Sequence, residues 1–185
     1  MIKMISLVQR FDNSILLYIK DNMHGIIMDK SMVISTYLGN GGIIWIIIIV
    51  ILMINKKYRK IGFMALGALI LSTILGEEIL KNVVKRIRPS ENIPAWNLLI
   101  SKPLSYSFPS GHTTSSFAVA GVLVRYFKHY AFEFLGLASL IGFSRLYLYV
   151  HYPTDILAGI VLGLMCSGII IYVFDKTNHN SKVRI

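Results

Sequence analysis

Five long apolar segments alternate with short polar ones along the chain. They extend over residues 32–54, 61–80, 111–127, 131–150 and 154–174. A helix needs about 20 mostly apolar residues to cross the hydrocarbon core of a bilayer, and these segments are close to that length. Because the bilayer core offers no water to backbone groups, helices that satisfy their own hydrogen bonds are expected. The pattern predicts an all-α integral membrane bundle of about five spans, with residues 1–185 as a single domain.

Two stretches depart from this simple pattern. The run GNGG at residues 39–42 interrupts the first apolar segment and predicts a kink or an unwound turn there. In residues 1–30, apolar residues recur at helical spacing, while charged residues fall at other positions; the apolar set is Val8, Phe11, Ile15 and Ile19. This spacing predicts an amphipathic helix lying in the membrane interface. A sixth span is the alternative, although four charges between residues 10 and 21 would make it costly.

Composition supports a membrane protein. Hydrophobic residues make up 55% of the chain and charged ones 15%, and the mean hydropathy is +0.62. Soluble domains average roughly 45–50% apolar residues and roughly 25% charged residues. These values exclude a disordered chain, a disulfide scaffold and an ordinary soluble enzyme. The one cysteine, Cys166, is expected to be a small buried hydrophobe. No short apolar run leads to a small-residue cleavage site at the N-terminus, so no cleavable signal peptide is expected.

The net charge of +10 comes from basic residues that flank the apolar segments. Lipid headgroups and phosphate-bearing ligands are therefore expected as partners, rather than nucleic acid. In a five-span bundle the basic stretches 55–60, 125–129 and 175–185 fall on one side, which is predicted to be cytoplasmic, with 175–185 as a tail. The loop over residues 83–110 on the opposite side is also basic, and an anion site would account for that charge.

The first polar cluster follows the second apolar segment and reads KNVVKRIRP over residues 81–89. Lys81 and Arg88 are seven positions apart, so a continuous helix would place them on one face, two turns apart. Their long side chains could then converge on one anion, and Pro89 would make the chain leave the helix. The neighbouring Glu77 and Glu78 are expected to pair with Lys81. A cationic membrane anchor is the alternative interpretation of this cluster.

The second cluster reads FPSGHT over residues 108–113 and precedes the third apolar segment. Ser110 is a favourable N-cap, and Gly111 lets the backbone approach a ligand closely. The free N–H groups of a helix N-terminus attract an anion, and His112 in that first turn is suited to proton transfer. The alternative is a capped helix with an incidental histidine.

The third cluster contains Arg145, His151 and Asp155. Asp155 follows His151 by four positions, near enough to accept a hydrogen bond from one ring nitrogen. The other ring nitrogen would then be free to act as a nucleophile or a base. Arg145, near the end of an apolar span, is costly without an anionic partner. The alternative is a purely structural ion pair between Arg145 and Asp155.

Together the three clusters spell K-x6-R-P, P-S-G-H and S-R-x5-H-x3-D. This pattern closely resembles that of the type 2 phosphatidic acid phosphatase (PAP2) superfamily, which includes lipid phosphatases and bacterial undecaprenyl-diphosphate phosphatases. The eleven matching residues are Lys81, Arg88, Pro89, Pro109, Ser110, Gly111, His112, Ser144, Arg145, His151 and Asp155. The motifs cover residues 81–155, and the helical layout extends the resemblance to about residue 174.

The resemblance implies a role for each polar residue of the motifs. His151 would be the nucleophile that forms a phosphohistidine, Asp155 would orient it, and His112 would protonate the leaving oxygen. The phosphoryl oxygens would be held by Lys81, Arg88, Arg145, Ser110 and the N–H of Gly111. No cofactor and no metal are implied, since cationic side chains supply the charge stabilisation that a metal would otherwise give.

These observations predict a membrane-embedded, metal-independent lipid phosphatase. Within the superfamily, the compact chain with an amphipathic N-terminal segment looks most like an undecaprenyl-diphosphate phosphatase in the cell membrane, with an active site facing the extracytoplasmic side. Hydrolysis of phosphatidic acid or phosphatidylglycerophosphate, and phosphoryl transfer to another lipid, are the alternatives. A transporter or anion-binding protein would explain the basic cluster but not His151 beside Asp155. The oligomeric state is left open.

Overall fold

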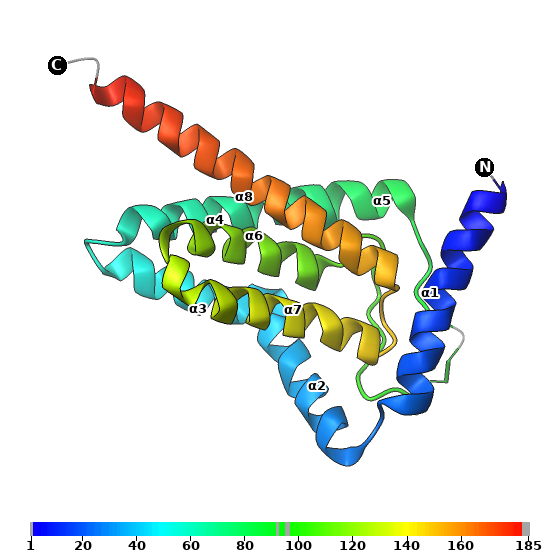
Figure 1. The fold of residues 1–185 in the computed structure, drawn as a ribbon. Coiled ribbons are helices and arrows are strands. Elements are labelled where there is room, and N and C mark those ends of the chain that lie inside the picture. The colour runs from blue at the N-terminus through cyan, green and yellow to red at the C-terminus, as the bar shows by residue number, and fades with distance from the viewer. Residues whose placement is uncertain (1, 92, 95–96, 183–185) are drawn as a thin grey trace.

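The computed structural model describes residues 2–91, 93–94 and 97–182, and these residues form helices and connecting loops without a β-strand (Figure 1). The helices are α1 (Ile2–Asn22), α2 (Ile26–Gly39), η1 (Asn40–Gly42), α3 (Ile43–Ile54), α4 (Arg59–Thr73), η2 (Ile74–Leu80), α5 (Lys81–Val84), α6 (Gly111–Tyr126), η4 (Lys128–Tyr130), α7 (Ala131–Tyr147) and α8 (Pro153–Lys182). The predicted all-α class is confirmed.

Helix α6 forms the centre of the bundle and packs against α4, α7 and α8. Its side chains from Phe117 to Leu123 are largely buried in a core that also contains Trp45 and Ile141. The approach of α8 to α6 is close, because a Cβ added at Gly163 would lie 2.5 Å from the carbonyl oxygen of Thr114. The tight central packing holds the N-terminus of α6 in a fixed position.

Three helical segments within the described residues are long and apolar enough to cross a membrane, namely Ile26–Ile54, Arg59–Val84 and Pro153–Thr177. They correspond to three of the five predicted spans. The other two correspond to α6, with 16 residues, and α7, with 17 residues, which are shorter. The number of crossings therefore stays a prediction.

The first of these segments is broken where the sequence predicted an interruption. Gly41 and Gly42 have φ values of +58° and +71°, in the left-handed region that glycine adopts without steric cost. The preceding Asn40 begins the short 3₁₀ turn η1. The break gives α2 and α3 different directions and places residues 39–42 beside the N-terminus of α6.

The second segment changes its helical form before it ends. Residues Ile74–Leu80 wind as a π-helix between α4 and α5, a rare form that occurs frequently at functional sites. Helix α5 ends at Val84, because Lys85 adopts a left-handed conformation with φ +49°. The prediction that Lys81 and Arg88 share one helical face is therefore wrong, since Arg88 lies in the loop after the helix.

Helix α1 lies beside the end of the bundle where α7 stops and α8 starts, and it packs against both (Figure 1). Its buried residues are Asp12, Leu16 and Ile19, whereas Val8 and Phe11 are exposed. The predicted amphipathic helix is present, but the face turned to the bundle includes a carboxylate that the apolar spacing did not assign to it.

The basic connections lie at the other end of the bundle. Figure 1 shows the α3–α4 and α6–α7 connections, together with the C-terminal end of α8, opposite the loop that follows α5. This arrangement agrees with the prediction that residues 55–60, 125–129 and 175–185 share one side, as far as residue 182; residues 183–185 lie outside the described part of the chain.

Candidate active site

A cavity of about 570 Å³ opens between α4–α5, α6, α7 and the break at residues 39–42. It is lined by six of the eight predicted site residues, namely Lys81, Arg88, Gly111, His112, Arg145 and His151. The other two, Ser110 and Asp155, are fully buried and are not part of the lining. The fold thus gathers three separate sequence clusters around one space.

Three cationic side chains face this cavity while being almost fully buried. The exposed fractions of Lys81, Arg88 and Arg145 are 5%, 6% and 4%. The Nζ atom of Lys81 lies 2.7 Å from both carboxylate oxygens of Glu77, which confirms the expected pair, whereas Glu78 is exposed. Among the described residues that line the cavity, Glu77 supplies the one carboxylate, so positive charge is in excess.

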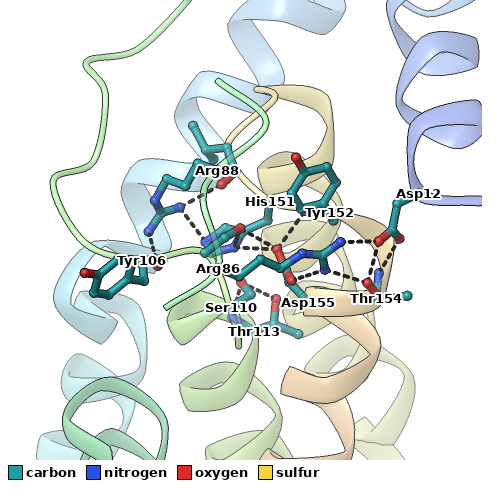
Figure 2. A network of polar contacts seen from close by, with 12 residues as sticks. Asp12, Arg86, Arg88, Tyr106, Ser110, Thr113, His151, Tyr152, Thr154 and Asp155 are labelled. Carbon is teal, nitrogen blue, oxygen red and sulfur yellow. Dashed lines mark hydrogen bonds and ion pairs between the residues drawn. The ribbon is translucent and has the colours of Figure 1, made fainter. Parts of the chain in front are cut away.

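Arg88 is fixed by the backbone of two loops. It donates from Nε to the carbonyl oxygen of Ser105 at 2.7 Å, from Nη2 to that of Tyr106 at 3.0 Å, and from Nη1 to that of Val150 at 2.7 Å. Nη1 also lies 2.9 Å from Nε2 of His151 (Figure 2). Burial lowers the pKa of Arg88 to about 10, so the guanidinium is charged at neutral pH. Since Arg88 can only donate, Nε2 of His151 accepts and Nδ1 carries the proton.

The other side of the His151 ring meets Asp155 and Ser107. Nδ1 is 3.5 Å from Oδ2 of Asp155 and 3.4 Å from Oγ of Ser107, and Ser107 donates to the same Oδ2 at 2.5 Å. The direct contact is longer than an ordinary hydrogen bond, and catalytic hydrogen bonds are often long before substrate binds. Burial lowers the pKa of His151 to about 3, against the opposing effect of Asp155. The imidazole is therefore neutral at pH 7, as a nucleophile requires.

Arg145 reaches the cavity from α7 with its hydrogen bonding incomplete. Nη1 donates to Oγ1 of Thr36 on α2, while the buried Nε has no partner among the described residues. The alternative ion pair with Asp155 is absent, because Oδ1 of Asp155 accepts instead from Nη1 of Arg86 at 2.7 Å. A buried, unpaired donor is costly and points to an anionic ligand in the cavity.

The N-terminus of α6 forms another wall of the cavity. Ser110 is the N-cap, as predicted, with Oγ accepting from the backbone N–H of Thr113; its contact with phosphate stays a prediction. A Cβ added at Gly111 would collide with Oε1 of Glu77, so the Glu77 side chain reaches the N-terminus of α6. Nε2 of His112 is 2.8 Å from Oδ1 of Asn40 in the broken helix.

Sequence reasoning missed several polar residues around the site, namely Asp12, Thr36, Asn40, Arg86 and Ser107. The sequence pattern indicates Asp12 only as a charge on an interfacial helix and Arg86 only as a charge in a basic loop. One signal was available: Asp12 lies four residues after Val8 and seven before Ile19, in line with the apolar stripe. The described residues contain no group of three or more His, Cys, Asp or Glu that could hold a metal ion.

Known proteins share both the sequence and the fold. A family model described as the PAP2 superfamily matches residues 62–179. An undecaprenyl-diphosphatase of Sulfolobus acidocaldarius is 35% identical over 122 residues, which cover 65% of this chain and 58% of that relative. The chain thus spans less than two thirds of the length of that relative.

Two solved structures extend the similarity over most of the chain. LpxE of Aquifex aeolicus is 30% identical with a TM-score of 0.75, covering 88% of this chain and 95% of its own. A PAP2-type phosphatidylglycerolphosphate phosphatase of Bacillus subtilis is 26% identical with the same TM-score, covering 92% and 87%. Since the family match encloses all the motifs from residue 81 to residue 155, this membrane protein belongs to the PAP2 superfamily.

Proposed function

We propose that the chain is a metal-independent lipid phosphatase that converts undecaprenyl diphosphate to undecaprenyl phosphate through a phosphohistidine at His151. One observation carries the proposal: three buried cations line the same cavity as the buried His151, and one of them, Arg145, keeps an unpaired N–H. An anion with several oxygens fits this arrangement, and a nucleophile stands next to it.

The first step transfers the terminal phosphoryl group to the enzyme. Nε2 of His151 attacks phosphorus, and Arg88 exchanges its contact with Nε2 for a phosphoryl oxygen. The bond from phosphorus to the bridging oxygen breaks, and His112 gives that oxygen a proton. Charge on the phosphoryl oxygens is offset by Lys81, Arg88, Arg145, the N–H of Gly111 and, as the family resemblance implies, Ser110.

The second step releases phosphate. Water attacks the phosphohistidine, the bond from phosphorus to Nε2 breaks, and His112 takes up the proton from the water. Asp155 stabilises the imidazolium that exists between the two steps. Each cycle restores both histidines, and the products are a lipid monophosphate and inorganic phosphate.

The cavity wall supports a lipid substrate. Leu69, Ile70 and Ile74 of the α4–η2 region line the cavity, and the last two are 51% and 46% exposed on the apolar surface of the helix. An acyl or isoprenoid tail could extend over this surface. The preference for undecaprenyl diphosphate is based on the similarity to the undecaprenyl-diphosphatase of Sulfolobus acidocaldarius. Phosphatidylglycerophosphate or phosphatidic acid, and phosphoryl transfer to another lipid, remain the alternatives.

A substrate panel tests the proposal. The purified full chain, in detergent and with a chelator present, should release phosphate from undecaprenyl diphosphate faster than from phosphatidylglycerophosphate or phosphatidic acid. A higher kcat/KM for either phospholipid would make that phospholipid, rather than undecaprenyl diphosphate, the substrate. Phosphoryl transfer to an added lipid alcohol would indicate a phosphotransferase. Activity that disappears with the chelator and returns with a divalent ion would contradict the mechanism.

We further propose that the protein is multi-pass in the cell membrane, with the site outside and residues 175–185 inside. The basic connections at the end opposite the site support this orientation. In a Cys166→Ser background on intact cells, a Leu104→Cys variant should react with an impermeant thiol reagent and a Lys56→Cys variant should not; both positions are exposed. The reverse labelling would overturn the orientation.

A further inference from the structure

A second polar network lies beside Asp155, on the side away from Arg88, and extends through Arg86 to Asp12 (Figure 2). Asp12, in the middle of α1, has no exposed surface. Its Oδ1 accepts from the backbone N–H of Thr154 at 3.0 Å, and its Oδ2 accepts from the Thr154 hydroxyl at 2.6 Å and from Nη2 of Arg86 at 2.6 Å. Asp12 thus satisfies a free N–H in the first turn of α8 from a separate helix.

Arg86 connects this carboxylate to Asp155. Its Nη1 donates to Oδ1 of Asp155 and to Oγ1 of Thr154, both at 2.7 Å, and its guanidinium lies 4.0 Å from the ring centroid of Tyr152. Burial would lower the pKa of Arg86, but the hydrogen bond with Asp12 and the charge of Asp155 outweigh it and raise that pKa. The guanidinium is therefore a permanent bridge between two carboxylates.

This bridge determines which oxygen of Asp155 faces the nucleophile. Oδ1 is held by Arg86, so Oδ2 is left for Ser107, for the N–H of Tyr152 at 2.9 Å and for the ring of His151. Rotation of the carboxylate would break the contact with Arg86. The charge of Asp12 matters as well, because it balances Arg86 and leaves the charge of Asp155 available to the imidazolium.

We propose that Asp12 is a positioning residue for the nucleophile, acting through Arg86 and Asp155, so that α1 is part of the catalytic apparatus. The inference rests on the proposed phosphohistidine chemistry of His151. Asp12 does not line the cavity, so its loss should lower kcat and leave KM nearly unchanged. Leu16 and Ile19 on the same face keep α1 packed when Asp12 is replaced by the isosteric asparagine.

A double-mutant cycle tests this role with two substrates, undecaprenyl diphosphate and p-nitrophenyl phosphate. Asp12→Asn should reduce kcat about 10- to 100-fold with KM within about twofold. In an Asp155→Asn background the same change should cost less than about twofold, because the route to His151 is already broken. Asp21→Asn, at an exposed position of the same helix, is the matched control and should match the wild type. Arg86→Lys, which keeps the charge but loses the fork, should behave like Asp12→Asn and serves if that variant does not fold.

The outcomes separate the inference from the proposed function. Two results would overturn the inference and leave the proposed function standing. One is a kcat of Asp12→Asn within about twofold of the wild type. The other is a double variant whose fold-loss in kcat equals the product of the losses of Asp12→Asn and Asp155→Asn, which would mean that the two residues act independently. If the wild-type chain hydrolyses p-nitrophenyl phosphate but not undecaprenyl diphosphate, the proposed lipid substrate is wrong. The double-mutant cycle with p-nitrophenyl phosphate still tests the role of Asp12. A wild-type chain that hydrolyses neither compound overturns both.

Discussion

The two sides of the His151–Asp155 pair are built differently. On the cavity side, Lys81, Arg88 and Arg145 bring three positive charges against one carboxylate, and Nε of Arg145 is unpaired. On the side of α1, each charge meets an opposite charge, and the hydroxyls between them are hydrogen-bonded. The cavity side is thus left incomplete for a ligand, whereas the α1 side is complete without one. Binding and positioning are separated in space, and they can be disrupted separately.

The largest effect is expected where the two sides meet. His151→Ala removes the proposed nucleophile, so turnover should fall by about 10⁴-fold or more with every substrate, and no phosphoenzyme should form. His112→Ala should lose about 10²–10⁴-fold with phosphatidic acid, whose alkoxide leaving group needs a proton, and much less with p-nitrophenyl phosphate, whose leaving group, like the phosphate monoester released from a lipid diphosphate, needs none. Rapid-quench trapping of radiolabelled phosphoenzyme measures the first change, and comparison of the two substrates measures the second. Full activity in His151→Ala would exclude the mechanism.

A smaller effect is expected from one change on the cavity side. Arg145→Lys keeps the charge but replaces a planar fork by a point donor, so kcat/KM should fall about 10²-fold. Inorganic phosphate should raise the Tm of the wild type and raise that of Arg145→Lys less. An unchanged kcat/KM together with unchanged phosphate stabilisation would assign Arg145 a structural role through Thr36.

A still smaller effect is expected from one change beside His151 and Asp155, outside the cavity lining. Ser107→Ala removes the donor that lies 2.5 Å from Asp155, and kcat should fall about tenfold because one hydrogen bond to a charged carboxylate is lost. KM and the stabilisation by inorganic phosphate should stay at the wild-type level, in contrast to Arg145→Lys. A rise in KM would show that Ser107 contacts the substrate.

The smallest effect is expected in the pH profile. Burial lowers the pKa of His151 to about 3, so the imidazole of this proposed nucleophile stays neutral as the pH falls. The acidic limb of kcat/KM that belongs to His151 should lie below about pH 5, whereas an ordinary histidine would give a limb near 6.5. Because Asp155 favours the imidazolium, Asp155→Asn should move that limb to still lower pH. A limb near the ordinary value, measured with p-nitrophenyl phosphate, would contradict the proposed burial of the nucleophile.

The parts of this molecule that the sequence predicts are those encoded by neighbouring residues. The helices follow from apolar length, the N-cap at Ser110 from its position before an apolar run, and the break at residues 39–42 from consecutive glycines. The contact of Glu77 with Lys81 follows from a spacing of four on one helix. The candidate catalytic residues came from a specific motif pattern, and the fold places them near one another.

The parts that the sequence does not predict depend on distant segments or on unusual backbone. Nothing near Asp12 indicates a partner at Arg86, which is 74 positions away and whose geometry requires the whole fold. The spacing of Lys81 and Arg88 suggested one helix, but Lys85 in a left-handed conformation ends it early. Ser107 looked like an ordinary loop residue, because only the tertiary structure places it between His151 and Asp155.

The π-helical stretch Ile74–Leu80 contains Glu77 and directly precedes Lys81, so the number of residues in this stretch determines where the ammonium group of Lys81 lies in the cavity. An α-helix turns by about 100° per residue, so deletion of one residue from this stretch would rotate everything that follows it by roughly a quarter of a turn. Such a deletion at Ile79 would shorten the chain between Glu77 and Lys81 and carry the ammonium group toward a different neighbour, although no site residue had been replaced. We therefore expect the activity to depend on the number of residues in this turn of helix as well as on the identity of the side chains.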